Sequence, residues 1–202
     1  METRVNIFVE GEADKKFFAD FLSFLKIDNN SYNIIELRGK DNLFKETIIN
    51  LIQSNTDNGG KNLVIIDADN SKEDRENEIL ERNKVYNLCF DLFIMPNNKD
   101  KGALEDLLEQ IINTDNQPIF DCWNNYEGEL KTIKITNRPN PLTIPTKKTK
   151  IYAYLEVLLG NSRKEKELIK EKNRDYLNKS HWDLGASYLI PLKEFILKYF
   201  DR

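Results

Sequence analysis

Two acidic motifs of this chain stand directly after apolar runs. Asp67 and Asp69 follow a Leu-Val-Ile-Ile run, and Glu10 follows the apolar residues of VNIFV. Strand residues two apart project on the same side, so Asp67 and Asp69 are expected to converge on one small volume. Two like charges that close are costly unless a cation neutralises them, and carboxylate oxygens suit Mg²⁺ or Mn²⁺. The pattern therefore predicts a divalent-metal site.

The residues after Glu10 extend this prediction. Gly11 permits a tight turn, and Asp14 stands in the first turn of an expected helix, where a negative charge also favours the helix dipole. Acidic residues at strand ends and helix starts are also common as caps, so one Asp-x-Asp motif is weak evidence by itself. Two independent strand ends of the same kind strengthen the metal hypothesis.

These motifs require a sheet whose strand ends meet at one edge. Apolar runs predict strands at residues 4–10, 32–38, 62–69 and 87–96. Periodic apolar residues predict helices at about 12–26, 41–53, 71–83 and 97–112, the second of them capped by Asp41 or Asn42. The continuous apolar run before Asp67 is typical of a strand covered on both faces. The βαβαβαβα order predicts an α/β fold with a mainly parallel, Rossmann-like sheet flanked by helices, and ligands beyond its carboxyl edge.

The second half of the chain is expected to form a helical extension. Residues 1–115 are predicted to be the α/β core, and residues 116–202 a mostly helical part packed on it in a single compact unit. Helical periodicity returns near 150–160 and 188–200. His181, the sole histidine, is expected to pack beneath the last helix beside Trp182, which argues against a histidine-based nuclease.

The composition excludes several classes of protein. The chain has 202 residues and 40% hydrophobic content, yet no run approaches the roughly 18 to 20 apolar residues of a membrane span. No signal-peptide pattern opens the sequence, so a cytoplasmic protein without membrane contact is expected. Cys89 and Cys122 form no CxxC motif and are expected to be buried free thiols. Neither a GxSxG elbow nor a complete Walker A motif occurs.

Charge is distributed unevenly along the chain. Residues 1–128 carry 14 Lys and Arg against 25 Asp and Glu, whereas residues 129–179 carry 13 against 6. A basic segment can meet phosphates electrostatically. Much of the positive charge lies in SRKEKELIKEKNR, however, where mixed charges favour an ordinary solvated helix.

Three motifs together resemble the TOPRIM fold of primases, topoisomerases and OLD (overcoming lysogenization defect) nucleases. FVEGEAD at 8–14 resembles the first-strand motif of OLD-like members, IIDAD at 65–69 resembles their DxD strand, and GALE at 102–105 resembles their later helix start. The matches cover about the first 115 residues in the family's order. The whole chain also resembles a bacterial family of TOPRIM-related domains of unknown function, notably in NKDKGALEDLL and in its Trp-containing end.

The TOPRIM resemblance implies a set of site residues. One or two Mg²⁺ or Mn²⁺ ions would be bound by Glu10, Asp14, Asp67, Asp69 and Glu105. Glu73 or Asp74 is a candidate to assist from the helix after the DxD motif. OLD-like nucleases also use a lysine near the scissile phosphate, for which the candidates here are Lys147, Lys148 and Lys150; Lys150 is included in the predicted catalytic set with Glu10, Asp67 and Asp69. A surface role remains the alternative for Glu105 and for each lysine.

The resemblance further implies a metal-dependent nuclease that hydrolyses phosphodiesters of DNA or RNA, with an ATPase as a possible protein partner in mobile-element or phage defence. The alternative is a metal-binding but catalytically silent module that recognises nucleic acid or protein without cutting it. The sequence leaves the choice of DNA or RNA and the oligomeric state open. A topoisomerase would need a further tyrosine-bearing domain, for which this chain has no room.

Overall fold

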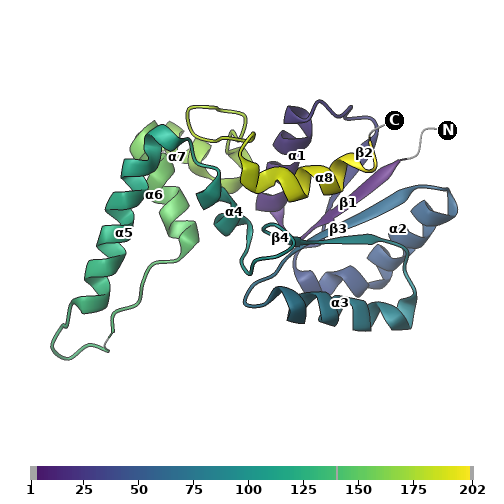
Figure 1. The fold of residues 1–202 in the computed structure, drawn as a ribbon, viewed down its shortest axis with the longest axis horizontal. Coiled ribbons are helices and arrows are strands. Elements are labelled where there is room, and N and C mark those ends of the chain that lie inside the picture. Colours follow the sequence, from purple (N-terminus) through teal and green to yellow (C-terminus); the bar gives the residue numbers. More distant parts are fainter. Residues whose placement is uncertain (1–3, 140, 201–202) are drawn as a thin grey trace.

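A four-stranded parallel sheet forms the centre of the computed structural model, which describes residues 4–139 and 141–200 (Figure 1). Its strands are β1 (Val5–Val9), β2 (Tyr32–Glu36), β3 (Lys61–Asp67) and β4 (Asp91–Met95). They lie in the order β2-β1-β3-β4, and each neighbouring pair is parallel. Val9 pairs with Ile65, so the residues that follow β1 and β3 reach the same edge. The predicted parallel α/β architecture is confirmed.

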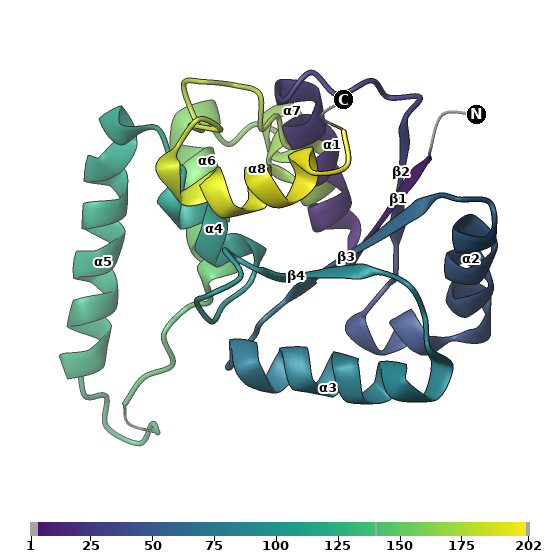
Figure 2. The same ribbon diagram turned by 45° about the vertical axis from the view of Figure 1, so that its right-hand side comes forward.

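Helices cover both faces of this sheet (Figure 2). One face carries α2 (Glu46–Asp57) and α3 (Lys72–Tyr86), and the other carries α1 (Glu12–Phe24) and α8 (Ile190–Leu197). Successive residues of β3 alternate between the two cores: Val64 and Ile66 pack with residues of α2 and α3, whereas Leu63 and Ile65 pack with those of α1. This double burial explains why the β3 sequence is continuously apolar.

The later helices extend the core on the α1 side. They are α4 (Leu104–Gln110), α5 (Gln117–Thr132), α6 (Lys147–Leu159) and α7 (Arg163–Ile169). Aromatic side chains join them, since the ring of Tyr154 in α6 lies 5.1 Å from that of Phe120 in α5 and 5.5 Å from that of Trp182. Trp182 and Tyr176 share one buried cluster with Phe17 of α1. In Figure 1, α5 and α6 lie side by side and project from the body. We call these two helices, with the loop residues 133–139 and 141–146, the arm.

The second helix begins later than predicted. Residues Lys40–Phe44 form a 3₁₀ turn, and α2 begins only at Glu46, so the expected cap at Asp41 or Asn42 is wrong. Leu43 is completely buried in the core beneath the sheet. Burial of apolar side chains in the turn, rather than capping, therefore directs the chain here.

Cys89 and Cys122 are free, as predicted, but both are exposed, so their predicted burial is wrong. β4 begins at Asp91, so Cys89 precedes the strand instead of lying within it. Cys122 lies on α5. His181 is buried, at 8% exposure, and its backbone carbonyl accepts a hydrogen bond from the Tyr154 hydroxyl. Within the described ranges, every helix is too short or too polar to cross a membrane.

Candidate metal centre

Glu10 and Asp67 meet at the carboxyl edge of the sheet. Glu10 is the residue after β1, and Asp67 is the last residue of the neighbouring β3. The backbone N–H of Asp67 donates to Oε1 of Glu10 at 3.1 Å. The parallel pairing of the two strands thus brings these two carboxylates together, as the sequence predicted.

Asp14 is held against the same edge by the start of α1. Its Oδ2 accepts a hydrogen bond from the backbone N–H of Gly11 at 2.9 Å, and its side chain is buried. Gly11 itself has extended backbone angles, and an added Cβ would lie 3.5 Å from Asp14 Oδ2, an ordinary contact. Neither conformation nor space demands glycine at position 11, so the turn expected there is not the reason for this residue.

Gly102 lies between Asp69, to which it is hydrogen-bonded, and the helix that carries Glu105. The backbone N–H of Asp69 donates to the Gly102 carbonyl at 2.9 Å, and Glu105 lies in the first turn of α4 immediately beyond. Gly102 has φ +135°, and a Cβ there would lie 2.5 Å from Cγ of Asp106. Both the backbone angle and the close approach therefore require glycine at this position.

Burial and mutual repulsion raise the pKa values of three carboxyl groups. The pKa of Asp67 rises from 3.8 to about 9, mainly through burial, and the charges of Asp14, Glu10, Glu105 and Asp69 add to the rise. Burial likewise raises the pKa of Asp14 to about 7 and is the main cause of the raised pKa of Glu10. All five carboxylates predicted as metal ligands thus act on one electrostatic site. Without a bound cation, this site favours protons on Asp67 at neutral pH.

Asp69 departs from the expected geometry. β3 ends at Asp67, and Asp69 has φ +53°, so the strand alternation that would align the two aspartates does not extend to it. Its Oδ2 is contacted by Nη2 of Arg75 and lies 3.1 Å from Nζ of Lys40. The buried Arg75 also donates from Nε to the Asp67 carbonyl at 3.1 Å. Two side-chain cations therefore already neutralise Asp69.

No three His, Cys, Asp or Glu side chains within residues 4–139 and 141–200 are arranged as a preformed metal-binding group. The pairing of Asp69 with Arg75 contributes to this, because it directs one carboxylate to a cation of the protein. The donor set nevertheless fits a hard divalent ion chemically: it is all carboxylate, and it includes buried groups that a cation would help to ionise. Using Asp69 as a ligand would require it to exchange Arg75 for the metal.

The three candidate lysines differ in their surroundings. Lys147 pairs with Asp106 of α4, and Lys148 pairs with Glu171 at 2.5 Å. The pKa of Lys148 is raised, first by its hydrogen bond to Glu171, and the nearby charge of Glu105 contributes.

Lys150, in contrast, is buried between α4, α5 and α6. Its ammonium lies 3.4 Å from Glu109, donates to Asn124 at 3.0 Å and sits 4.7 Å from the ring centre of Phe120. These contacts suit a packing role. Glu73 and Asp74, the candidates on α3, are exposed in its first turn.

Sequence reasoning missed two residues beside the cluster. Arg75 lies on a helix rich in charge, and no local signal separates it from the other basic residues of α3. Tyr176 comes from the extension, where burial is the first cause of its raised pKa of about 12 and the charges of Asp14 and Glu105 contribute. The neighbouring Arg174 acts in the opposite direction and lowers the pKa of Tyr176 through its charge and a side-chain hydrogen bond. Only the packed structure shows that these residues surround the carboxylates.

A parallel α/β sheet with clustered carboxylates at its carboxyl edge and a helical extension defines a class of domain that supports several activities. The chain belongs to the family described as protein of unknown function (DUF3226), whose model matches residues 4–201. No curated protein and no solved structure matches the chain.

Proposed function

We propose that this protein is a Mg²⁺- or Mn²⁺-dependent hydrolase of nucleic-acid phosphodiesters, of the OLD-like TOPRIM type. The observation that carries the proposal is the cluster of carboxylates around Asp67, whose pKa is raised to about 9 by burial and by its four acidic neighbours. A fold that gathers buried acids without neutralising all of them favours a site for a ligand over a structural role. The order of the three sequence motifs, FVEGEAD, IIDAD and GALE, supports the OLD-like TOPRIM type.

The residues have separable roles in this proposal. Glu10, Asp14, Asp67 and Glu105 bind one or two ions, and Asp69 joins them when it leaves Arg75. Bound divalent ions would supply an activated water and neutralise charge on the attacking and leaving oxygens. Lys148 is the preferred candidate to stabilise the leaving oxygen, because its ammonium already lies within the field of Glu105. Lys150 supports the packing of α4 against the arm.

A catalytically silent metal-binding module is the second candidate. Its support is the engagement of Asp69 by Arg75 and Lys40, together with the pairing of all three candidate lysines. In either case we place the protein in the cytoplasm, where nucleic acid and an ATPase partner would be available.

Metal titration and cleavage assays test the proposal together. Calorimetry with MgCl₂ and with MnCl₂ measures binding, and labelled DNA and RNA measure cleavage in the same buffers. We expect Asp67→Asn and Asp69→Asn to lower the cleavage rate by about 100-fold or more. Asp57→Asn is the matched control, because Asp57 is an exposed aspartate at the end of α2, at the opposite edge of the sheet.

The outcomes separate the two candidates. Metal binding and nucleic-acid binding without turnover would replace the hydrolase by the silent module. Absence of metal binding in the native protein would reject both. Cleavage that survives in folded Asp67→Asn at the native rate would reject the assigned site.

A further inference from the structure

The positive charge of the extension is concentrated in one stretch. Residues 131–150 carry six Lys or Arg and no Asp or Glu, whereas the body of the chain, residues 1–128, is acidic. Five of the six are exposed, namely Lys131, Lys134, Arg138, Lys147 and Lys148. The α7 region, residues 162–174, which the sequence also marked as basic, mixes six Lys or Arg with three Glu and so carries half the net charge of residues 131–150. The larger part of the surplus therefore belongs to the arm, from the end of α5 to the start of α6.

The two ends of this basic stretch differ in their ion pairs. Among the described residues, neither Lys131 nor Lys134 forms an ion pair, whereas α3 pairs its lysines with glutamates one turn away. The inner part is anchored to the body, since Lys147 pairs with Asp106 and Lys148 with Glu171. Lys131 and Lys134, for which the described residues show no ion pair, thus lie toward the free end of the arm.

The arm lies beside the carboxylate cluster. The views of Figures 1 and 2 agree that the arm stands beyond the carboxyl ends of the strands, with its loop projecting away from the body. The pairing of Lys147 with Asp106 fixes the start of α6 against α4, one residue beyond Glu105. The basic stretch therefore begins next to the proposed metal centre and extends outward from it.

Apolar side chains accompany the charges. Tyr126, Ile133 and Ile135 are 45%, 43% and 47% exposed, near the same end of the arm. Exposed aromatic and apolar groups interleaved with basic ones suit a flexible polyanion whose bases contact protein without sequence readout.

We propose that residues 131–139 and 141–149 of the arm bind the sugar-phosphate backbone of a nucleic acid. This inference rests on the proposed function and names the surface that would hold the substrate. The acidic edge alone repels a polyanion, so a nucleic acid that presents a phosphodiester to the carboxylates needs compensating positive charge nearby. The arm supplies that charge, and its contacts are independent of base sequence.

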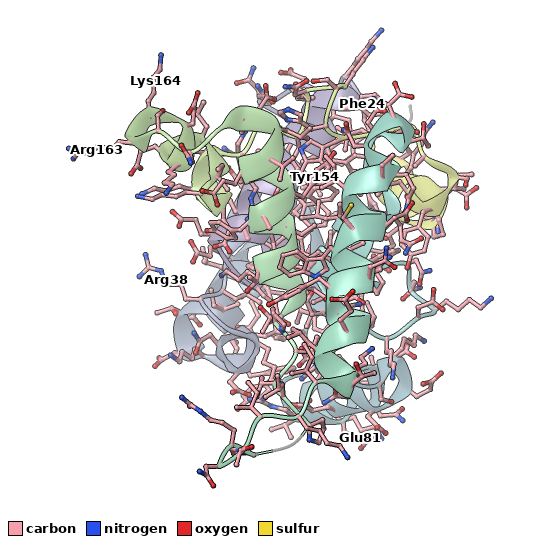
Figure 3. The ribbon with its side chains drawn as sticks, turned by 90° about the vertical axis from the view of Figure 1, so that its left-hand side faces the viewer. Phe24, Arg38, Glu81, Tyr154, Arg163 and Lys164 are labelled. Atoms are coloured by element: carbon pink, nitrogen blue, oxygen red, sulfur yellow. The ribbon has the colours of Figure 1, made fainter. Side chains whose placement is uncertain are left out.

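Binding measured in EDTA tests the arm apart from metal and cleavage. The probes are fluorescently labelled single-stranded DNA, duplex DNA and hairpin RNA of mixed sequence, followed by anisotropy over a series of KCl concentrations. The test variant combines Lys131→Gln, Lys134→Gln and Arg138→Gln. The control variant removes three exposed charges elsewhere with Arg163→Gln, Lys164→Gln and Lys172→Gln. Figure 3 shows Arg163 and Lys164 at the end of the helix pair away from the loop.

We expect the arm variant to lose affinity by about tenfold or more at low salt and to lower the slope of log K against log salt by about 2 to 3. The control variant should keep most of the affinity and slope. Circular dichroism establishes that both variants are folded.

Two results would overturn the inference: native protein that binds none of the three probes, or an arm variant that binds with the native slope. Arm-dependent binding without metal binding would keep the inference and reject the proposed hydrolase. Metal-dependent cleavage together with unchanged nucleic-acid binding by the arm variant would keep the proposed hydrolase and reject the inference about the arm.

Discussion

The two edges of the sheet contain buried polar groups with opposite properties. At the amino edge, the amide of Asn62 is 3% exposed and lies within hydrogen-bond distance of the carbonyls of Ile52 and Cys89 and of the Thr56 hydroxyl. Its oxygen accepts from Asn55 at 3.0 Å. These groups are neutral, and both the donor and the acceptor of Asn62 are satisfied.

The carboxyl edge, in contrast, buries acids that repel one another. The Asp14 carboxylate accepts a hydrogen bond from the backbone N–H of Gly11. The pKa values of Asp14 and Asp67 rise to about 7 and about 9, first because both groups are buried. A satisfied amide network contributes stability, whereas unneutralised buried acids oppose it. We infer that the amino edge serves the fold and that the carboxyl edge is retained for a ligand.

The largest expected effect on stability comes from the amino edge. Asn62→Ala removes a buried amide and leaves backbone carbonyls without their partner, so the free energy of unfolding should fall by about 2 to 4 kcal/mol. Urea unfolding followed by tryptophan fluorescence measures the change. Asn50→Ala, at an exposed position of α2, is the control and should change stability by less than about 0.5 kcal/mol. Equal effects of the two substitutions would contradict the structural role of the amino edge.

A bound divalent cation should offset the loss of stability that the buried acids at the carboxyl edge cause. If Mg²⁺ or Mn²⁺ binds the folded state alone, a concentration of 100 times Kd stabilises the protein by about 2.7 kcal/mol. Thermal unfolding with and without metal measures the resulting rise in Tm, about 2 to 4 °C per kcal/mol for a chain of this size. Asp57→Asn should show the full rise and Asp67→Asn little of it. A Tm that metal leaves unchanged in the native protein would indicate that this edge binds no cation.

The sequence predicted the sheet because its signals are local and strong. The apolar run of β3 and the alternation of strands with helices are confirmed. The start of α2 could not be predicted from capping residues, because burial of Leu43 beneath the sheet sets the path of the chain there. The exposure of Cys89 likewise follows from where β4 begins, which an apolar run alone does not determine.

The site was predictable where it follows from strand geometry. Glu10 and Asp67 converge because neighbouring parallel strands end together. Asp69 turns toward Arg75 because its backbone leaves the strand with a positive φ, which no sequence period describes. Tyr176 reaches the cluster only through the packing of the extension on α1. Residues supplied by tertiary packing therefore escaped a prediction made from local patterns.

A smaller loss of stability is expected from a substitution of Gly102, which lies between the Asp69 backbone and the first turn of α4 that carries Glu105. Gly102→Ala places a side chain at φ +135° and against Asp106, which should destabilise the protein by about 1 to 2 kcal/mol and displace the start of α4. Because Glu105 lies on that first turn, metal affinity in calorimetry should also fall. Gly128→Ala is the control, since its Cβ meets nothing within 4 Å and the residue lies within α5, where alanine is favoured. A native metal affinity in Gly102→Ala would show that Glu105 does not depend on this turn.

The last expected effect is a change in stability with pH in the metal-free protein. The pKa of Asp67 is about 9 in the folded state and ordinarily 3.8, so between these values the folded protein keeps a proton that the unfolded chain releases. Stability from this group is therefore present at low pH and is lost as the pH rises through that window. Asp67→Asn cannot ionise, so in EDTA the stability of the variant should rise relative to that of the native protein with increasing pH, by at most about 1.4 kcal/mol per pH unit within this window. With saturating Mg²⁺ the order should reverse, because the cation stabilises the native carboxylate alone. Urea unfolding at several pH values measures both differences, and a variant less stable than the native protein in EDTA at pH 8 would mean that Asp67 contributes to the fold as the amino edge does.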